Sequence, residues 1–437
     1  MNGWRQFWTW VLPGMRLKRW IMLAIAGILA INGAVGLAVY DFLRPGPSLS
    51  GWAAFSFLLG VVAVAAGGNR VISEVVEVLR PNANLAEVMY QSRSRRRGPK
   101  IVAIGGGTGL STLLRGLKEY SDNITAIVTV ADDGGSSGRL REELGVLPPG
   151  DIRNCLAALA SEERLLTELF QFRFPGETGL GGHSFGNLFL AAMTGIAGDL
   201  MSAIQYSSRV LAVRGQVLPA TMAQMTLFAR FSDGNTVRGE SNISAARRPI
   251  VDMWCEPETP AALPEAIAAI EEADCIIVGP GSLYTSLVPH LLIPGLRDAL
   301  NRTRAPILYV CNVMTQPGET DGFPASEHVK VLRHFGGEGV VQHVLVNEAL
   351  PLRLRDKYRA EGQFPVELDW DALVAMGVTP VRGAFIDERE SVRHNPSLLA
   401  AAIMTWWEAL APEEPPKVQG PRFKPGEVPF PDARFGV

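Results

Sequence analysis

A strand–loop–helix–strand unit over residues 100–139 constrains the fold more than any other part of the chain. Residues 100–104 read KIVAI, a short branched run bounded by glycine, as a buried parallel strand would be. The glycine-rich run GGGTGLS follows at 105–111, and the helical pattern STLLRGLKEY begins at Ser111. A second apolar run, residues 123–131, predicts the neighbouring parallel strand.

The loops of this unit are suited to a nucleotide. Glycine lets the backbone turn tightly and approach a ligand, and a helix that begins there presents free N–H groups to a phosphate. Asp132 and Asp133 follow the second strand, where a dinucleotide-binding fold places an acid for a ribose hydroxyl. The loop matches neither G-x-G-x-x-G, because Leu110 stands at the third glycine position, nor a Walker A loop. A tight turn without a ligand is the alternative.

Strand-like and helix-like runs alternate after Lys100, which predicts an α/β domain with a Rossmann-like, mainly parallel sheet and helices on both faces. Further strands are expected at 274–278, 307–311, 343–346 and 381–386, and a hairpin at 225–231 and 236–239. Helices are expected at 152–161, 164–170, 188–194, 200–207, 264–272, 294–301 and 326–335, with Asp199 as the cap of the fourth.

Glycine and polar residues gather after four of these strands, at 105–111, 132–139, 279–286 and 312–320. The carboxyl ends of parallel strands share one edge of a sheet, where ligands of open α/β folds bind. The four loops therefore predict a single site. In GPGSLYTS at 279–286, the Tyr284 ring is expected to pack on a base or sugar; packing against the sheet is the alternative.

Two further loops carry chemistry. In PPGDIRN at 148–154, Asp151 stands where a ligand residue or a simple helix N-cap would stand. In GGHSFGN at 181–187, His183 is either a ligand residue or a donor that stabilises a turn. Residues 182–186 spell the G-x-S-x-G of a hydrolase, but no strand is expected before them, so we discount a nucleophile elbow.

The first hundred residues predict a transmembrane helical hairpin. Residues 20–40 and 52–68 are apolar runs, the first about 20 residues long as a membrane-spanning helix requires. Arginine and lysine flank the pair on both outer sides, whereas the turn at 41–51 holds only Arg44. The positive-inside rule then places both ends in the cytoplasm. A cleaved signal peptide and a buried hairpin of a soluble protein are the alternatives.

These boundaries predict a membrane segment with a basic linker at 1–98, a nucleotide-binding domain at 99–410 and a Pro-rich, extended tail at 411–437. The expected location is the cell membrane as a multi-pass protein with its large domain cytoplasmic. The net charge of −3 gives no reason to expect nucleic acid. Four cysteines without C-x-x-C spacing indicate reduced, packed thiols.

Taken together, GGGTGLS, ADDGGSSGRLR at 131–141, PPGDIRN, GHSFGN at 182–187, GPGSLYTS and NVMTQPGET at 312–320 resemble the gluconeogenesis factor (YvcK) branch of the CofD-like, 2-phospho-L-lactate transferase family. The resemblance covers about residues 100–396. It implies a Rossmann-like cytoplasmic domain that binds a nucleotide or a UDP-sugar such as UDP-N-acetylglucosamine, with a link to cell shape and cell-wall precursor supply. The hairpin departs from the simplest members of that branch.

The expected ligand residues are Gly105, Gly106, Gly107, Thr108, Gly109, Ser111, Asp132, Asp133, Ser136, Ser137, Arg139, Asp151, Asn154, His183, Asn187, Gly279, Gly281, Ser282, Tyr284, Thr285, Asn312 and Thr315. Asp132 and Asp133 are also the candidate Mg²⁺ ligands, and with His183 they are the candidate catalytic residues.

Two functions follow from the resemblance. One is a membrane-tethered UDP-sugar-binding regulator, which needs phosphate loops but no catalytic base. The other is a transferase that moves a phospholactyl group from a nucleotide carrier to a deazaflavin precursor. The expected partners are a nucleotide-sugar and a lipid bilayer at residues 20–68; a homodimer and a cell-wall enzyme are the protein partners to consider.

Overall fold

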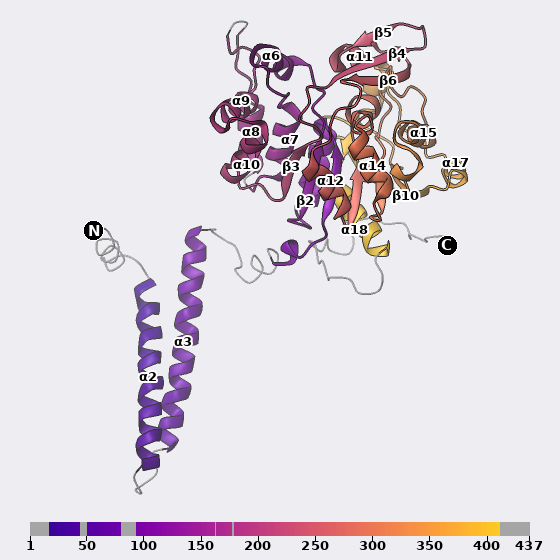
Figure 1. Cartoon of the computed structure of the whole chain (residues 1–437). Helices are drawn as coiled ribbons and strands as arrows, with labels where there is room; N and C mark the ends of the chain where they lie inside the picture. The colour runs from indigo at the N-terminus through magenta and orange to yellow at the C-terminus, as the bar shows by residue number, and fades with distance from the viewer. Residues whose placement is uncertain (1–16, 44–49, 80–92, 162, 177–178, 411–437) are drawn as a thin grey trace. The chain divides into compact units, whose positions relative to one another are not determined.

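The computed structural model describes residues 17–43, 50–79, 93–161, 163–176 and 179–410 of the chain (Figure 1). The chain divides into two compact units, Met1–Ser92 and Arg93–Val437. The expected tail at 411–437 lies outside the described residues.

The second unit contains a seven-stranded, entirely parallel sheet in the order β10-β9-β8-β7-β1-β2-β3. Its strands are β1 (Ile101–Gly105), β2 (Ile124–Val128), β3 (Gln216–Pro219), β7 (Cys275–Val278), β8 (Ile307–Val310), β9 (His343–Asn347) and β10 (Thr379–Gly383). The chain runs outward from β1 to β3 and then returns to pair β7 with the other side of β1. This reversal makes the gap between β1 and β7 the topological switch point of a Rossmann-like sheet.

Alternate residues of each strand enter opposite cores. In β1, Val102 and Ile104 join one hydrophobic cluster, whereas Ile101 and Ala103 join the other. This period of two is the geometry of a strand, and burial on both faces explains why the strands read as continuous apolar runs. The sheet therefore carries helices on both faces, as expected from the sequence.

The helices of this unit cover the sheet and its edges (Figure 1). They are α5 (Gly107–Leu117), α6 (Gly135–Leu144), α7 (Gly150–Leu159), α8 (Glu163–Gln171), α9 (Phe185–Ala197), α10 (Leu200–Val210), α11 (Glu240–Ala246), α12 (Pro264–Glu271), α13 (Val288–Leu291), α14 (Pro294–Arg302), α15 (Ala325–Gly336), α16 (Arg355–Ala360), α17 (Trp370–Ala375) and α18 (Pro396–Leu410). A π-turn, η1 (Leu283–Leu287), precedes α13, and a 3-10 turn, η2 (Glu338–Val340), follows α15. Asp199 caps α10 by accepting the Ser202 N–H at 2.9 Å, as predicted.

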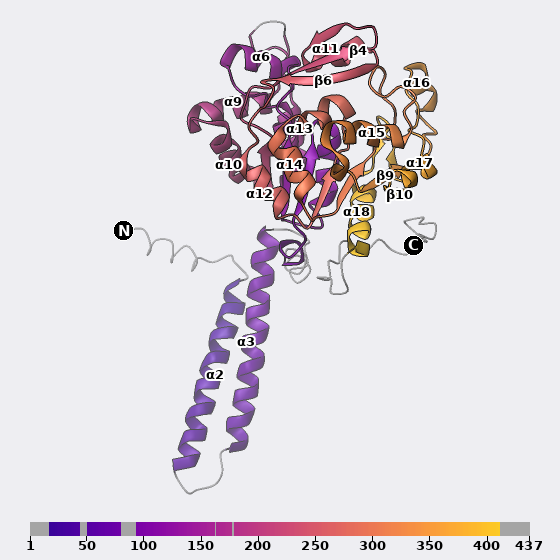
Figure 2. The ribbon, with the colours of Figure 1, turned by 45° about the vertical axis from the view of Figure 1, so that its right-hand side comes forward.

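A small antiparallel sheet in the order β5-β4-β6 lies at the same end of the large sheet as α6 (Figures 1 and 2). It consists of β4 (Thr226–Phe231), β5 (Thr236–Arg238) and β6 (Ile250–Glu256). The β4–β5 pair is the expected hairpin. The run expected as one strand at 381–386 is divided instead between β10 and a short strand β11 (Ile386–Asp387), which pairs with β12 (Arg393–His394).

The first unit is a pair of long helices, α2 (Leu17–Leu43) and α3 (Ser50–Leu79). Both extend beyond the expected spans, and segments of 25 and 23 residues within them are long and apolar enough to cross a membrane. The helices touch where glycines face each other: a Cβ on Gly27 would lie 2.7 Å from the Gly60 oxygen. Such small-residue contacts are typical of membrane helix pairs. The Ser56 hydroxyl also donates to the Ala30 carbonyl at 3.2 Å.

The basic run expected as a linker up to Gly98 is partly packed on the large domain. Arg95 pairs with Asp122 at 3.7 Å, and the Asn123 amide donates to the carbonyls of Arg96 and Gly98. The domain therefore begins near residue 93, a few residues before the expected boundary.

Candidate functional site

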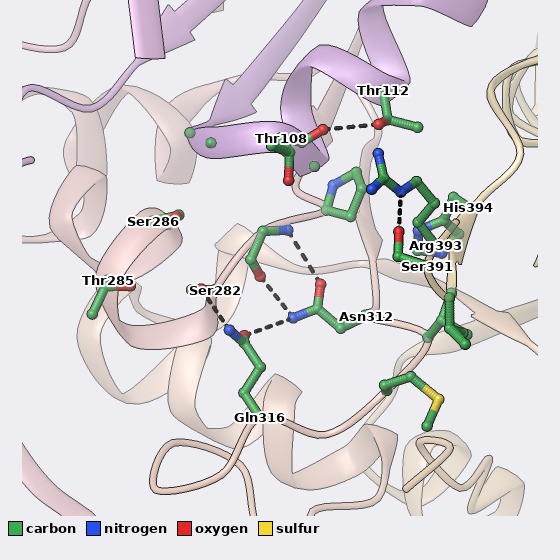
Figure 3. A pocket seen from close by; sticks show the side chains of 18 of the residues that line it. Thr108, Thr112, Ser282, Thr285, Ser286, Asn312, Gln316, Ser391, Arg393 and His394 are labelled. Atoms are coloured by element: carbon green, nitrogen blue, oxygen red, sulfur yellow. Dashed lines mark hydrogen bonds between the residues drawn. The ribbon is translucent and has the colours of Figure 1, made fainter. Parts of the chain in front are cut away.

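A cleft of about 500 Å³ opens at the carboxyl edge of the parallel sheet (Figure 3). The loops after β1, β2, β7 and β8 all contribute to its wall, through residues such as Gly107, Asp132, Gly281 and Asn312. This confirms that the polar loops share one edge. The cleft straddles the switch point between β1 and β7, which is where an open α/β sheet binds its ligand.

The loops after β1 and β7 touch each other at the base of the cleft. A Cβ on Gly109 would lie 2.3 Å from the Pro280 carbonyl oxygen, so only glycine allows this approach. The contact brings the start of α5 next to the Gly281–Ser282 turn. Both loops thus present backbone to one space, as a phosphate-binding surface requires.

Two amide side chains hold the β7 loop in place (Figure 3). Asn312 accepts the Gly281 N–H at 3.2 Å and donates to the Gly281 carbonyl at 2.8 Å. Gln316 donates to the Ser282 hydroxyl at 2.8 Å, and its side-chain oxygen accepts from Asn312. These bonds hold the backbone of the Gly281–Ser282 turn in place. They explain why the loop after β8 carries amide side chains at a position where a ligand residue was expected.

Carboxylates form another part of the cleft wall. Asp132 and Asp151 come from the loop after β2 and from α7, and Glu240 comes from the first turn of α11. Burial, with the nearby Asp132 and Asp133 charges, raises the pKa of Glu240 to about 7. Burial and Asp132 likewise raise the pKa of Asp151 to about 6. Because these acids repel one another, the cleft favours a bound cation or a ligand rich in hydrogen-bond donors.

Asp133 positions this wall rather than lining it. Its carboxylate accepts the N–H groups of Glu240 and Ser241 at 3.0 and 2.9 Å, so it ties the start of α11 to the loop after β2. Both carboxylate oxygens are therefore occupied by backbone donors. Asp133 lines neither cavity, so its expected contact with ribose or Mg²⁺ stays a prediction.

Asp151 lies inside α7 and does not cap it; Pro149 is the residue at the cap position. Its carboxylate accepts the Gly107 N–H and lies against Gly106, where a Cβ would approach its Oδ2 atom to 2.6 Å. Asp151 therefore shapes the glycine loop directly. The N-cap alternative from the sequence is wrong.

We expect Asp151→Asn to stabilise the protein at neutral pH. The folded-state pKa is raised above the ordinary value of about 3.8, so ionised Asp151 lowers stability by up to about 3 kcal/mol above pH 7. Asparagine keeps an acceptor for Gly107 without the charge. The gain should shrink as pH falls from 7 through 6 toward 4, measured by urea unfolding; a gain independent of pH would contradict the burial of a charge.

The expected residues fall into three groups. Those that line the cleft are Gly106, Gly107, Thr108, Gly109, Asp132, Asp151, Gly281, Ser282, Thr285, Asn312 and Thr315. Those that line a neighbouring cavity are Ser136, Ser137, Asn154 and Asn187, together with Asp132 and Asp151. Those that line neither are Gly105, Ser111, Asp133, Arg139, His183, Gly279 and Tyr284.

Most members of the third group support the loops. Gly105 ends β1, and the Ser111 hydroxyl donates to the Thr108 carbonyl at 3.0 Å. Arg139 donates to the Gly181 carbonyl, and His183 is paired with the Ser136 hydroxyl at 3.1 Å. His183 thus matches the turn-stabilising alternative. Ser184 is the N-cap of α9, in agreement with the rejection of a nucleophile elbow.

Tyr284 is a correction. It is 5% exposed and belongs to a hydrophobic cluster, and its N–H donates to the Glu319 carboxylate at 3.3 Å. Burial raises the pKa of its phenol to about 12. The ring therefore packs against the core, the alternative considered from the sequence, because η1 (Leu283–Leu287) is itself largely buried.

Ser286 and Gln316 line the cleft from two of the predicted loops, whereas sequence reasoning missed several other lining residues: Thr112, Thr129, Glu240, Tyr358, Gln363, Ser391, Val392, Arg393 and His394. The segment at 391–394 includes β12. It follows the strand that was expected at 381–386, and no polar site loop was expected after that strand. Arg393 is the only arginine or lysine that lines the cleft among the described residues. Figure 3 shows its side chain extending toward Thr108 and Thr112 at the start of α5.

The described residues contain no group of three or more His, Cys, Asp or Glu side chains placed to hold a metal ion. Asp132 is the one expected ligand that still fits, because it borders the cleft while only its Oδ1 atom is engaged, by the Gly134 N–H at 2.9 Å. Mg²⁺ commonly binds through one or two carboxylates together with phosphate oxygens and water. A single carboxylate therefore suits an ion delivered with a phosphorylated ligand.

Fold and cleft define a Rossmann-like α/β protein with a candidate ligand site at its switch point. The family described as 2-phospho-L-lactate transferase CofD matches residues 101–386. The gluconeogenesis factor of Bacillus subtilis is 50% identical over 308 residues, which cover 70% of this chain and 97% of that protein. The chain belongs to this family, in its gluconeogenesis factor branch.

Other relatives differ in what they cover. A protein of Nostoc sp., which carries the same name in provisional form, is 48% identical over 432 residues, or 92% of this chain and 93% of its own length. A crystal structure of a Bacillus halodurans protein superposes with a TM-score of 0.68 at 48% identity, covering 70% of this chain and 99% of that one. The Nostoc match thus extends into the helical hairpin.

Proposed function

We propose that the chain binds a UDP-sugar, with UDP-N-acetylglucosamine favoured, and acts as a membrane-tethered regulator of cell shape and cell-wall precursor supply. The observation that carries this proposal is the cleft at the switch point, where two glycine loops meet opposite Arg393. Its volume is within the roughly 300–1,000 Å³ of small-molecule sites. No described hydroxyl that lines the cleft is bonded to a histidine, which favours binding over nucleophilic catalysis.

In this proposal the diphosphate lies between the start of α5 and the Gly281–Ser282 turn. Backbone N–H groups and the Arg393 guanidinium bind its oxygens, and Asp132 would hold Mg²⁺. Mg²⁺ would reduce the electrostatic repulsion between the diphosphate and the carboxylates that line the cleft. Binding should therefore weaken when Mg²⁺ is chelated.

Arg393→Gln should weaken UDP-N-acetylglucosamine binding by roughly 10- to 100-fold, because a charge-assisted bond to phosphate is lost. Arg393 is exposed and donates to Ser391 at 2.6 Å, so unfolding stability should hardly change. Isothermal titration measures the affinity. Arg302→Gln is the matched control, because that arginine is exposed at the end of α14 and lines neither cavity. Equal affinity in both variants would remove Arg393 from the site.

The hairpin is proposed to cross the membrane with both ends cytoplasmic. The support is the pair of apolar helices and the arginine bias on their outer flanks. Reporters fused after residues 46 and 97 should give opposite topology signals. Signals from the same side at both positions would exclude the hairpin.

A transferase of the phospholactyl type is the second candidate, favoured by the family match over residues 101–386. It would use the same cleft for a nucleotide carrier. Turnover of nucleotide in the presence of a deazaflavin acceptor distinguishes it from a regulator, since the proposed regulator binds without turnover.

A further inference from the structure

We infer that the chain carries a second ligand site, a cavity at the start of α6 that takes the oxyanion, phosphate or carboxylate, of a separate small molecule. This inference goes beyond the proposed function, and it does not depend on which ligand occupies the main cleft.

The cavity has its own walls and a volume of about 260 Å³. Only Asp132 and Asp151 are shared with the main cleft. The remaining wall is formed by Gly134, Gly135, Ser136, Ser137, Gly150, Arg153, Asn154, Arg173 and Asn187. A ligand here would lie on the other side of the two carboxylates from the ligand in the cleft.

Arg153 is the main reason to expect an anion. Its side chain is 9% exposed, and its two Nη atoms donate to the Ser184 hydroxyl at 2.6 Å and the Asn154 amide oxygen at 2.9 Å. Its Nε has no partner, and no carboxylate among the described residues lies within ion-pair distance of it. A buried guanidinium with an unpartnered N–H and no carboxylate in ion-pair contact is costly, so a bound oxyanion would stabilise it.

A second guanidinium strengthens the argument. Arg173 lines the same cavity and donates to the Gly182 carbonyl at 2.9 Å. Burial and the Arg173 charge both lower the pKa of Arg153. Their combined effect is larger than that of Asp151 and Asp132, which raise this pKa. Two positive groups that repel each other across one cavity favour an anion between them.

Polar groups at the start of α6 complete the site. The cap position, Gly134, supplies no side-chain bond to the first turn. The Ser137 hydroxyl accepts from Asn187 at 3.3 Å, which leaves its own hydrogen to donate. Asn187 is 2% exposed, and its side-chain oxygen has no partner. A ligand with an oxyanion and one donor group would satisfy both residues.

The test uses the full-length protein in detergent, with inorganic phosphate and acetate as probes in isothermal titrations. Arg173→Gln should weaken binding of the preferred probe by roughly 10- to 100-fold, and Ser137→Ala by a smaller factor. Arg209→Gln, an exposed arginine at the end of α10, is the matched control and should bind as the wild type does. Tighter binding of phosphate would identify a phosphoryl group, and tighter binding of acetate a carboxylate.

Independence from the cleft is tested in the same way. Saturation of the main cleft with UDP-N-acetylglucosamine should leave probe affinity at the second site unchanged. Failure of UDP-N-acetylglucosamine to bind would refute the proposed function alone. Absence of probe binding, insensitivity to Arg173→Gln, or displacement of the probe by the nucleotide-sugar would each overturn the second site.

Discussion

Gly107→Val is expected to reduce UDP-sugar affinity by on the order of 100-fold, since overpacking costs about 1–3 kcal/mol and a tenfold change about 1.4 kcal/mol. Gly107 lines the cleft, and a Cβ built on it meets no protein atom within 4 Å. A valine side chain would therefore project into the space that the ligand occupies. The Gly107 backbone, which is held by Asp151, would also lose its close approach to the phosphate.

Backbone strain has to be separated from this effect. Gly107 has a φ of +62°, which a β-branched residue tolerates poorly, so the variant should also lose about 1–2 kcal/mol of stability. Gly377→Val is the matched control: Gly377 has a φ of +69°, an exposed position and no atom near its Cβ. We expect Gly377→Val to lose a similar amount of stability and to bind the UDP-sugar as tightly as the wild type does. Equal binding by both variants would exclude a phosphate cradle at Gly107.

Tyr284→Ala is expected to lower the free energy of unfolding by about 3–5 kcal/mol, as truncation of a buried aromatic does. The ring is 5% exposed and packs within the cluster that includes Leu283 and Leu287. Urea unfolding of the variant measures the loss. Tyr206→Ala, in which the parent ring is 45% exposed on α10, should lose far less. A stable Tyr284→Ala protein with lost ligand binding would restore the role in the site that the sequence predicted.

The sequence predicts the parallel sheet well because its strands are buried on both faces. β1, β7 and β8 are short apolar runs with polar loops behind them, so both the strand and the ligand edge are visible locally. β3 was missed because QVLP is too short and contains proline. The pattern of β6 is weak, since Asp252 interrupts its alternation of buried and exposed positions.

The site was predicted where glycine marks it and missed where tertiary packing alone builds it. Arg393 and Tyr358 reach the cleft from segments far along the chain, and no local pattern sets them apart from other surface residues. Glu240 reaches it because Asp133 holds α11 by two backbone N–H groups. The same contact explains why an acid at a strand end, read as a ligand residue, turned out to be a support.

Titration of the full-length protein with UDP-N-acetylglucosamine in the presence of Mg²⁺ tests the central proposal most directly. We predict saturable binding at one site per chain, weakened in Gly107→Val and Arg393→Gln and retained in Gly377→Val and Arg302→Gln. Absence of saturable binding for UDP-N-acetylglucosamine and other UDP-sugars by a correctly folded protein would contradict it.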